Sequence, residues 1–267
     1  MNRRSFLMGL AAASTAASSA LLAPSRVLAA PKPILDKRFR LVIDPGHGGE
    51  NEGCHGHDHG VVEKELTLAM AQQLASRVHE LLPRAEILLT READETLHLS
   101  QRVAFANAAE ADLFLSLHCN ASPLSNQTGY ETFILDLEAS NEETALTAQR
   151  ENDEGFARPA NTSSEGDVST MLRELSMTAD RSRAAHFARA IQAQQRKLFP
   201  DRPDRGVRQG PFDVLLGARM PAVLHEVGFL DHPGEGPMLR SASGQAKLVE
   251  AIAQATASYY GDIVRRA

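Results

Sequence analysis

Histidine and glutamate side chains stand at the ends of apolar runs in this sequence, where they could act together on a metal ion. His47 follows the run LVI within the segment LVIDPGHGG, and His118 follows the run LFLSL. Glu226 lies inside a third apolar run, AVLHEVGF. A fourth candidate, Glu63, stands where a segment rich in glycine and histidine gives way to a helical pattern. These four residues are the candidates for chemistry.

Two histidines and one glutamate form a ligand set that zinc accepts. Catalytic zinc sites use three protein ligands, with imidazole nitrogen and carboxylate oxygen among the accepted types, and keep a fourth position for water. His47, Glu63 and His118 would supply such a set for one zinc ion, although other divalent ions would also bind it. Glu226 would remain free to take a proton from the water.

Each of these residues, taken alone, also has an ordinary structural interpretation. A lone histidine near a strand end often packs in the core, and Glu63 could be an acid that the helix dipole favours at a helix start. Glu226 is harder to explain by packing, because a buried carboxylate without a partner is costly. The agreement across three strand ends favours a metal site over separate structural roles.

The elements that would position these residues alternate between strands and helices. Hydrophobic periodicity predicts strands at 41–43, 86–90, 113–117, 130–135 and 222–224, and helices at 63–81, 99–109, 172–198 and 248–259. This alternation predicts an α/β fold, a single domain with a mostly parallel twisted sheet and helices on both faces. Ligands bind outside the carboxyl ends of the strands in such sheets, so we expect the candidates to meet there.

The first 29 residues are typical of an export signal rather than of a folded domain. Arg3 and Arg4 precede a run of alanine, leucine and serine, and the segment VLA offers a cleavage site. The pattern predicts a twin-arginine signal peptide at 1–29 and a periplasmic location in a bacterium, with a lead-in at 30–39. The apolar run is short and diluted, and no later run is long enough to span a membrane, so we expect no transmembrane anchor after cleavage.

The charge balance excludes two classes of partner. Removing residues 1–29, which hold three arginines and no acid, changes the net charge from −6 to −9. An acidic chain without a basic patch is not expected to bind nucleic acid, nor to be held by charge on an anionic membrane surface.

Beyond the separate residues, the order of the motifs resembles one known family. The segments are LVIDPGHGG at 41–49, EK at 63–64, TR at 90–91, Arg102 with AN at 106–107, SLHCN at 116–120, and 221–230. They resemble the zinc-dependent N-acetylmuramoyl-L-alanine amidases of the Amidase_3 family. The resemblance runs from about residue 40 to the C-terminus, so residues 40–267 are expected to form an amidase catalytic domain.

The resemblance implies both the site and the reaction. It implies His47, Glu63 and His118 as zinc ligands and Glu226 as the catalytic acid and base. The bond cut would be the amide between N-acetylmuramic acid and L-alanine in peptidoglycan, in cell-wall remodelling and daughter-cell separation. The alternatives are another periplasmic zinc hydrolase of the wall, a carboxypeptidase or deacetylase, or a non-catalytic wall-binding protein.

A polar insertion at 136–169 interrupts the pattern of strands and helices. Its position resembles that of the regulatory helix in the division-associated AmiA, AmiB and AmiC type of amidase, which covers the active site until a protein activator displaces it. Glu142 to Leu146 and Glu151 with Asn152 could start or carry such a helix, and an acid there could reach the zinc. A solvated loop is the alternative.

Three residues close to the candidates give further expectations. Cys54 and Cys119 both lie near the proposed metal in a chain bound for an oxidising compartment. We expect them to form a disulfide that ties the glycine- and histidine-rich loop to the third strand. His225 should point to the opposite face of its strand from Glu226 and serve in packing.

Overall fold

The computed structural model describes residues 38–57, 60–153 and 167–266, which belong to one compact unit, Ile34–Ala267. The predicted signal peptide at 1–29 and most of the lead-in lie outside the described residues. Among the described helices, none combines the length and the apolar character that a membrane span requires.

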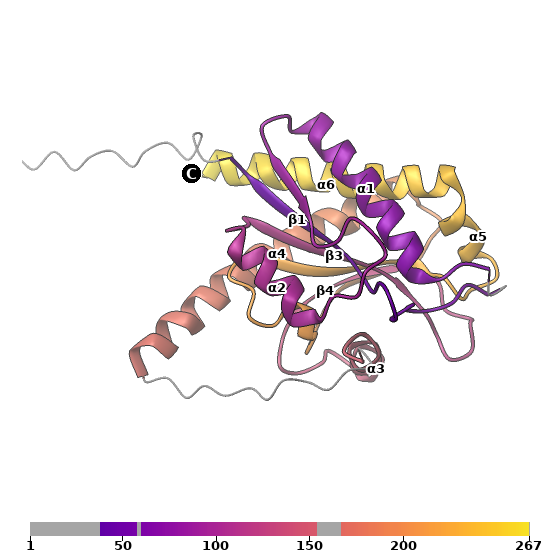
Figure 1. Cartoon of the computed structure of the whole chain (residues 1–267), viewed down its shortest axis with the longest axis horizontal. Coiled ribbons are helices and arrows are strands. Elements are labelled where there is room, and N and C mark those ends of the chain that lie inside the picture. The colour runs from indigo at the N-terminus through magenta and orange to yellow at the C-terminus, as the bar shows by residue number, and fades with distance from the viewer. Residues whose placement is uncertain (1–37, 58–59, 154–166, 267) are drawn as a thin grey trace, which may run out of the picture. The chain divides into compact units, whose positions relative to one another are not determined.

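Six strands form one mixed sheet in the order β2-β1-β3-β6-β4-β5 (Figure 1). The strands are β1 (Arg40–Pro45), β2 (Glu86–Leu89), β3 (Leu113–Asn120), β4 (Tyr130–Leu135), β5 (Asp204–Gly210) and β6 (Ala222–Phe229). All neighbouring strands are parallel except β4 and β6, which are antiparallel. The mostly parallel sheet is therefore confirmed. The edge strand β5 was not predicted, because its sequence DRGVRQG contains no apolar run.

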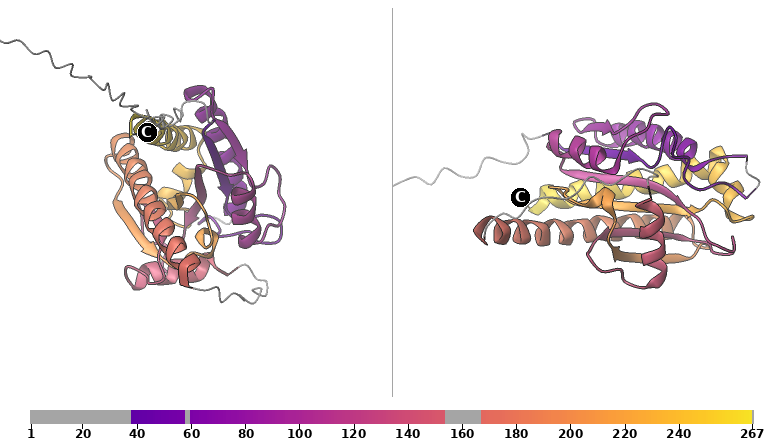
Figure 2. Two further views of the ribbon diagram at one scale, coloured as in Figure 1. Left: turned by 90° about the vertical axis from the view of Figure 1, so that its left-hand side faces the viewer. Right: turned by 60° about the horizontal axis from the view of Figure 1, so that its bottom comes forward.

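Helices cover both faces of the sheet, as predicted (Figures 1 and 2). One buried cluster joins the strands to α1 (Glu63–Leu81), α4 (Asp167–Leu198) and α6 (Ala242–Arg266). A second cluster joins the opposite face to α2 (Leu99–Ala108), α3 (Glu142–Glu151) and the short 3-10 helix η2 (Asp213–Leu215), while α5 (Glu235–Arg240) precedes α6. The predicted helix at 172–198 begins earlier, at Asp167, and the one at 248–259 is the middle of α6.

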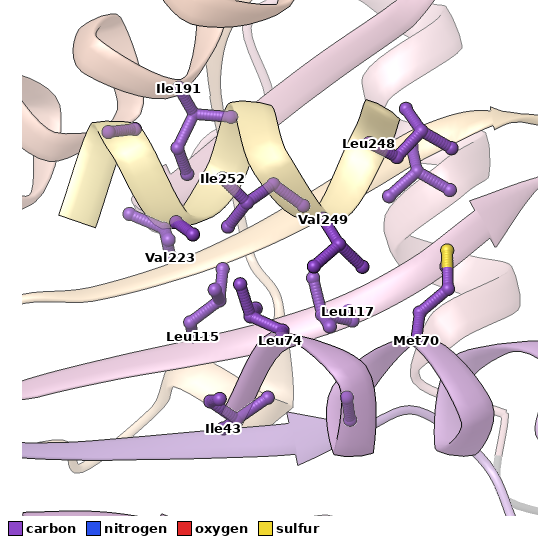
Figure 3. Packing of buried hydrophobic residues seen from close by; sticks show 14 of the residues in the cluster. Ile43, Met70, Leu74, Leu115, Leu117, Ile191, Val223, Leu248, Val249 and Ile252 are labelled. Atoms are coloured by element: carbon purple, nitrogen blue, oxygen red, sulfur yellow. The ribbon is translucent and has the colours of Figure 1, made fainter. Parts of the chain in front are cut away.

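The core fixes how the central strands lie against one another (Figure 3). Leu115 and Leu117 of β3 and Val223 of β6 pack with Leu74 of α1 and Ile252 of α6. All eight residues of β3 are buried, as expected for a central parallel strand that is covered on both faces. Because β1, β3 and β6 are parallel neighbours, their carboxyl ends meet at one edge of the sheet.

The two faces of β6 separate His225 from Glu226. The His225 ring is fully buried, its Nδ1 lies 2.9 Å from the Thr132 hydroxyl, and its Nε2 contacts Gln195 of α4. Burial lowers the pKa of His225 to about 3, so the ring is neutral near neutral pH. The predicted packing role of His225 is confirmed. Glu226 lies beside His118 across the β3–β6 ladder, where the two residues are register partners.

Candidate metal centre

The turn that carries His47 is held in place by a buried carboxylate and two arginines. Asp44 at the end of β1 is fully buried and accepts a 2.8 Å hydrogen bond from Arg102. Arg102 also donates to the His47 carbonyl at 2.7 Å, and Arg91 donates to the Pro45 carbonyl at 3.0 Å. His47 has a positive φ of 62°, a conformation that costs free energy in a non-glycine residue. The contacts of Arg91 and Arg102 therefore stabilise an unfavourable turn, and this turn directs the His47 ring toward Glu63 and His118.

Glu63 is a site residue rather than an exposed helix-start acid. It is the first residue of α1 and only 1% exposed. One carboxylate oxygen accepts a 2.8 Å hydrogen bond from the Cys54 amide, and the other accepts a 2.7 Å hydrogen bond from the Cys119 amide. Two backbone donors, from the loop and from β3, thus fix the carboxylate and leave its remaining lone pairs free for a cation.

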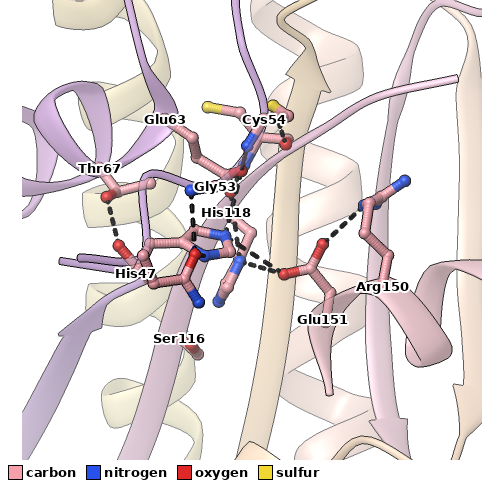
Figure 4. A network of polar contacts seen from close by, with 12 residues as sticks. His47, Gly53, Cys54, Glu63, Thr67, Ser116, His118, Arg150 and Glu151 are labelled. Carbon is pink, nitrogen blue, oxygen red and sulfur yellow. Dashed lines mark hydrogen bonds and ion pairs between the residues drawn. The ribbon is translucent and has the colours of Figure 1, made fainter. Parts of the chain in front are cut away.

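The structure brings His47, Glu63 and His118 together, as the sequence predicted (Figure 4). His47 Nε2 lies 3.1 Å from one oxygen of Glu63, and His118 Nδ1 lies 3.2 Å from the other. The imidazole rings are 4.8 Å apart between centroids. Gly46 permits this approach, because a Cβ there would lie 2.5 Å from the His118 ring.

A fourth atom that could bind a metal comes from the insertion, where the sequence analysis expected that an acid could reach the site. Glu151, the last residue of α3, points its carboxylate at both histidines (Figure 4). Its Oε2 lies 2.7 Å from His118 Nδ1 and 3.4 Å from His47 Nε2. The helix begins at Glu142, and its N-cap is Asn141, whose side chain accepts a hydrogen bond from the Thr144 amide. The sequence analysis did not use this cap.

The atoms that converge here fit a divalent cation. His47 Nε2, His118 Nδ1 and Glu151 Oε2 are buried and approach one another without hydrogen-bond geometry. His47 Nδ1 faces Asn51 Oδ1 at 3.0 Å. Because an amide oxygen only accepts, Nδ1 carries the proton in the neutral ring, the form that can bind a metal, and Nε2 presents its lone pair. Ligand atoms on a tetrahedral zinc lie about 3.4 Å apart, close to the distances found. The group could therefore hold a metal ion.

Glu226 lies next to this group without being part of it. Its carboxylate is fully buried, and neither oxygen has a hydrogen-bond partner among the described residues. Burial, and then the negative charge of Glu151, raises the pKa of Glu226 well above its usual range. Arg150 of α3 places a guanidinium nitrogen 3.7 Å from Glu226 and donates to the Ala121 carbonyl and the Asn120 side chain. The sequence analysis missed Arg150.

Electrostatics couples the histidines to the two carboxylates. Burial alone would lower the pKa of His47, but the carboxylates of Glu63 and Glu151 raise it to about 9. The same balance raises the pKa of His118 well above its usual value. The buried carboxylates of Glu63 and Glu151 therefore favour positive charge at the site, either as protons on the histidines or as a divalent cation.

The predicted disulfide between Cys54 and Cys119 was wrong. Both cysteines are free thiols, and the Cys54 thiol lies 3.0 Å from the Cys119 carbonyl oxygen. The Cys119 side chain belongs to the core on the face of β3 opposite His118. The loop and β3 are indeed joined, but by this contact and by Glu63 rather than by a covalent bond.

A substitution at Gly53 is expected to disturb the ligands directly. Gly53 has a φ of +70°, and a Cβ there would lie 2.6 Å from both Glu63 Oε2 and His47 Cδ2. We expect Gly53→Ala to weaken zinc binding by about 10- to 100-fold, measured by competition with a chromophoric chelator. Gly217→Ala is the matched control, because Gly217 has a φ of +84° with nothing within 4 Å of the added Cβ. Equal affinities in the two variants would rule out this positioning role.

A His/Glu group able to hold a metal at the carboxyl ends of parallel strands in an α/β domain is the arrangement of a metalloenzyme site. A model of the N-acetylmuramoyl-L-alanine amidase family matches residues 41–258. AmiA, an N-acetylmuramoyl-L-alanine amidase of Escherichia coli K12, is 31% identical and covers 82% of this chain and 75% of its own length. The chain therefore belongs to the N-acetylmuramoyl-L-alanine amidase family, Amidase_3, as its motifs indicated.

Two further relatives define the extent of the likeness. The amidase AmiC of Neisseria meningitidis is 27% identical over 84% of this chain, which spans about half of that relative, 53% of its length. The solved catalytic domain of CwlV, an amidase from Bacillus (Paenibacillus) polymyxa, is 28% identical with a TM-score of 0.59, covering 84% of this chain and 98% of that domain. The likeness thus extends over the catalytic domain of the solved relative.

Proposed function

We propose that this protein hydrolyses the amide bond between N-acetylmuramic acid and L-alanine in peptidoglycan, with one zinc ion held by His47, Glu63 and His118. The observation that carries the proposal is the convergence of two unpartnered imidazole nitrogens on a fixed carboxylate. The buried acid Glu226 lies beside them, in a chain of the amidase family.

The chemistry divides between the metal and Glu226. A bound zinc would supply a Lewis acid that polarises the amide carbonyl. Glu226 takes the proton of the attacking water and delivers it to the leaving nitrogen of alanine, the role of a general base that becomes a general acid. Burial and the nearby negative charge of Glu151 raise the pKa of Glu226 above its usual range, so this carboxylate binds a proton taken from the water more readily than an exposed carboxylate would.

In the described arrangement α3 covers the site, and we infer that this is a self-inhibited state. Glu151 stands where a catalytic metal site keeps a position for water, while Arg150 sits beside Glu226. The helix α3 therefore obstructs both the proposed metal group and the proposed acid and base, Glu226.

The way in which α3 is held suits a displaceable element. Its buried residues besides Glu151 are two threonines and one alanine, Thr144, Thr147 and Ala148, and its large apolar residue, Leu146, is 56% exposed. Such a face gains little from apolar burial, so charge contacts supply most of the attachment. A partner protein that binds 136–169 can replace those contacts, which is the activator role proposed for it.

The setting proposed for this activity is the bacterial periplasm, during wall remodelling and daughter-cell separation. The support is the sequence at 1–29, where Arg3 and Arg4 precede an apolar run, a pattern typical of twin-arginine export. The net charge of −6 for the whole chain does not favour nucleic acid as a partner.

Metal removal tests the proposed reaction. We expect the protein to release free stem peptides with an L-alanine amino terminus from purified peptidoglycan. Chelation should lower the rate at least about 100-fold, and zinc should restore it, because the polarising ion is lost. Mass spectrometry of the soluble products is the measurement. Loss of only a terminal amino acid would indicate a carboxypeptidase, and release of acetate would indicate a deacetylase.

A further inference from the structure

A second contact of α3 lies outside the metal group, between Glu143 and two arginines of β5. One oxygen of the Glu143 carboxylate accepts a 2.7 Å hydrogen bond from Arg208 Nη1. The other oxygen contacts Arg205 Nη2. Each oxygen thus meets a different guanidinium, so the carboxylate is held by two charge-assisted contacts from two separate arginines. Neither arginine has a role in the proposed reaction.

The arginine pair is held from behind by residues that do not belong to α3. Glu131 of β4, only 1% exposed, lies 3.1 Å from Arg208 Nε and 3.4 Å from Arg205 Nε. Asn120 donates a 2.7 Å hydrogen bond to Glu131, and the Arg205 guanidinium lies over the Phe229 ring. Glu131 would therefore keep both guanidinium groups in place after α3 is displaced. The Nη donors that contact Glu143 would then be free to bind another carboxylate.

The pair also lies at a distance that a substrate peptide can span. Glu131 is the register partner of Glu226 across the β4–β6 ladder, and β5 is the next strand beyond β4. Two strand spacings place β5 about 10 Å from the strand of Glu226. An extended peptide advances about 3.3–3.6 Å per residue. A carboxylate within the first three residues beyond the scissile bond would reach the pair.

We propose that Arg205 and Arg208 form a subsite for a carboxylate of the peptide stem, and that Glu143 occupies this subsite while α3 is docked. The inference rests on the proposed amidase function and adds a substrate preference to it: stems with free carboxylates are bound in preference to stems whose carboxylates are carboxamides. α3 thus covers the substrate-binding part of the site as well as the metal group.

Substrate charge separates this subsite from a simple clamp on α3. If the arginines only clamp the helix, releasing it raises the rates for charged and amidated stems by the same factor, because both substrates meet the same fraction of open enzyme. If the arginines bind substrate, the ratio of the two rates depends on them. The ratio of kcat/KM values is therefore the quantity to measure.

The experiment uses the full chain and two synthetic muropeptides that differ only in free carboxylates or carboxamides on the stem. In Glu143→Gln, we expect kcat/KM for the charged stem to exceed that for the amidated stem at least about tenfold, since a charge-assisted, two-point contact is lost with the amide. Adding Arg208→Gln should reduce the preference below about twofold. The control Arg196→Gln, which removes an exposed arginine paired with Asp204 at the start of β5, should leave the preference unchanged.

A binding measurement separates failure of the subsite from failure of the proposed reaction. Calorimetric titration of Glu143→Gln with the charged and the amidated stem peptide, without sugar, should show the same preference whether or not the enzyme cleaves. Equal affinities, or a preference that survives Arg208→Gln, overturn the subsite. Should Arg208→Gln unfold, Arg208→Lys keeps the charge but not the paired donors. It must then lower the preference, and an unchanged preference again overturns the proposal.

Discussion

Replacing Glu226 by glutamine is expected to reduce amide hydrolysis by about 10²- to 10⁴-fold, the range attributed to a positioned general acid and base. Glutamine keeps the size of the side chain but cannot accept and return the proton. The Glu226 oxygens have no hydrogen-bond partner among the described residues and do not join the His/Glu group, so zinc binding should be unchanged. Release of stem peptides, together with the zinc content of the purified variant, is the measurement.

A ligand substitution gives the contrast that this test needs. His118→Ala should lose both zinc and activity, because His118 Nδ1 is one of the converging atoms. Glu226→Gln should lose activity alone. If Glu226→Gln turned over at the normal rate, Glu226 would not be the acid and base. If it lost zinc as well, Glu226 would be acting through the metal group.

Replacing Glu151 by alanine is expected to raise the basal activity, by about tenfold or more. Its carboxylate contacts both histidines and is flanked by Arg150. Losing a buried charge contact of this kind costs at least about 1.4 kcal/mol of docking free energy, and each such step changes the open fraction about tenfold. Initial rates of stem-peptide release, measured without any added partner, provide the comparison.

The control for this prediction comes from the same helix. Glu142 lies in the first turn of α3 and is exposed, so Glu142→Ala should leave the rate unchanged. A rate that is equal in Glu151→Ala and in the unaltered protein would show that α3 does not restrain the enzyme. A lower rate accompanied by zinc loss would make Glu151 a working ligand instead of an inhibitor.

Together, these contacts suggest that inhibition is distributed along α3. Glu151 faces the metal group, Arg150 faces Glu226, and Glu143 faces the arginine pair of β5. Each contact occupies a feature that the open enzyme would use for chemistry or for binding. A ten-residue helix is marginally stable by itself in water, so the loss of its docking contacts would also favour its unfolding.

The sequence by itself determined the central sheet and the main site residues. Buried parallel strands must be apolar along their length, so β1, β3 and β6 were visible as runs, and the polar residues His47 and His118 stood out at their ends. Because parallel strands end at the same edge, the meeting of these residues followed from topology alone. Their roles as ligands, and that of Glu226 as acid and base, remain predictions.

Only the tertiary structure decided which residues from distant segments complete the site. β5 has no apolar run, since its side chains are only partly buried at the sheet edge, and so Arg205 and Arg208 went unnoticed. Arg150 and Glu151 lie in the polar insertion, for which the family resemblance predicted a helix over the site with an acid near the metal. Only the structure decided that this acid is Glu151 and that Arg150 lies beside Glu226. The cysteines were close, as predicted, yet the Cys54 thiol contacts the Cys119 carbonyl oxygen and both thiols are free. Local sequence pattern reports burial and period, whereas contacts between segments depend on how side chains are aimed across space.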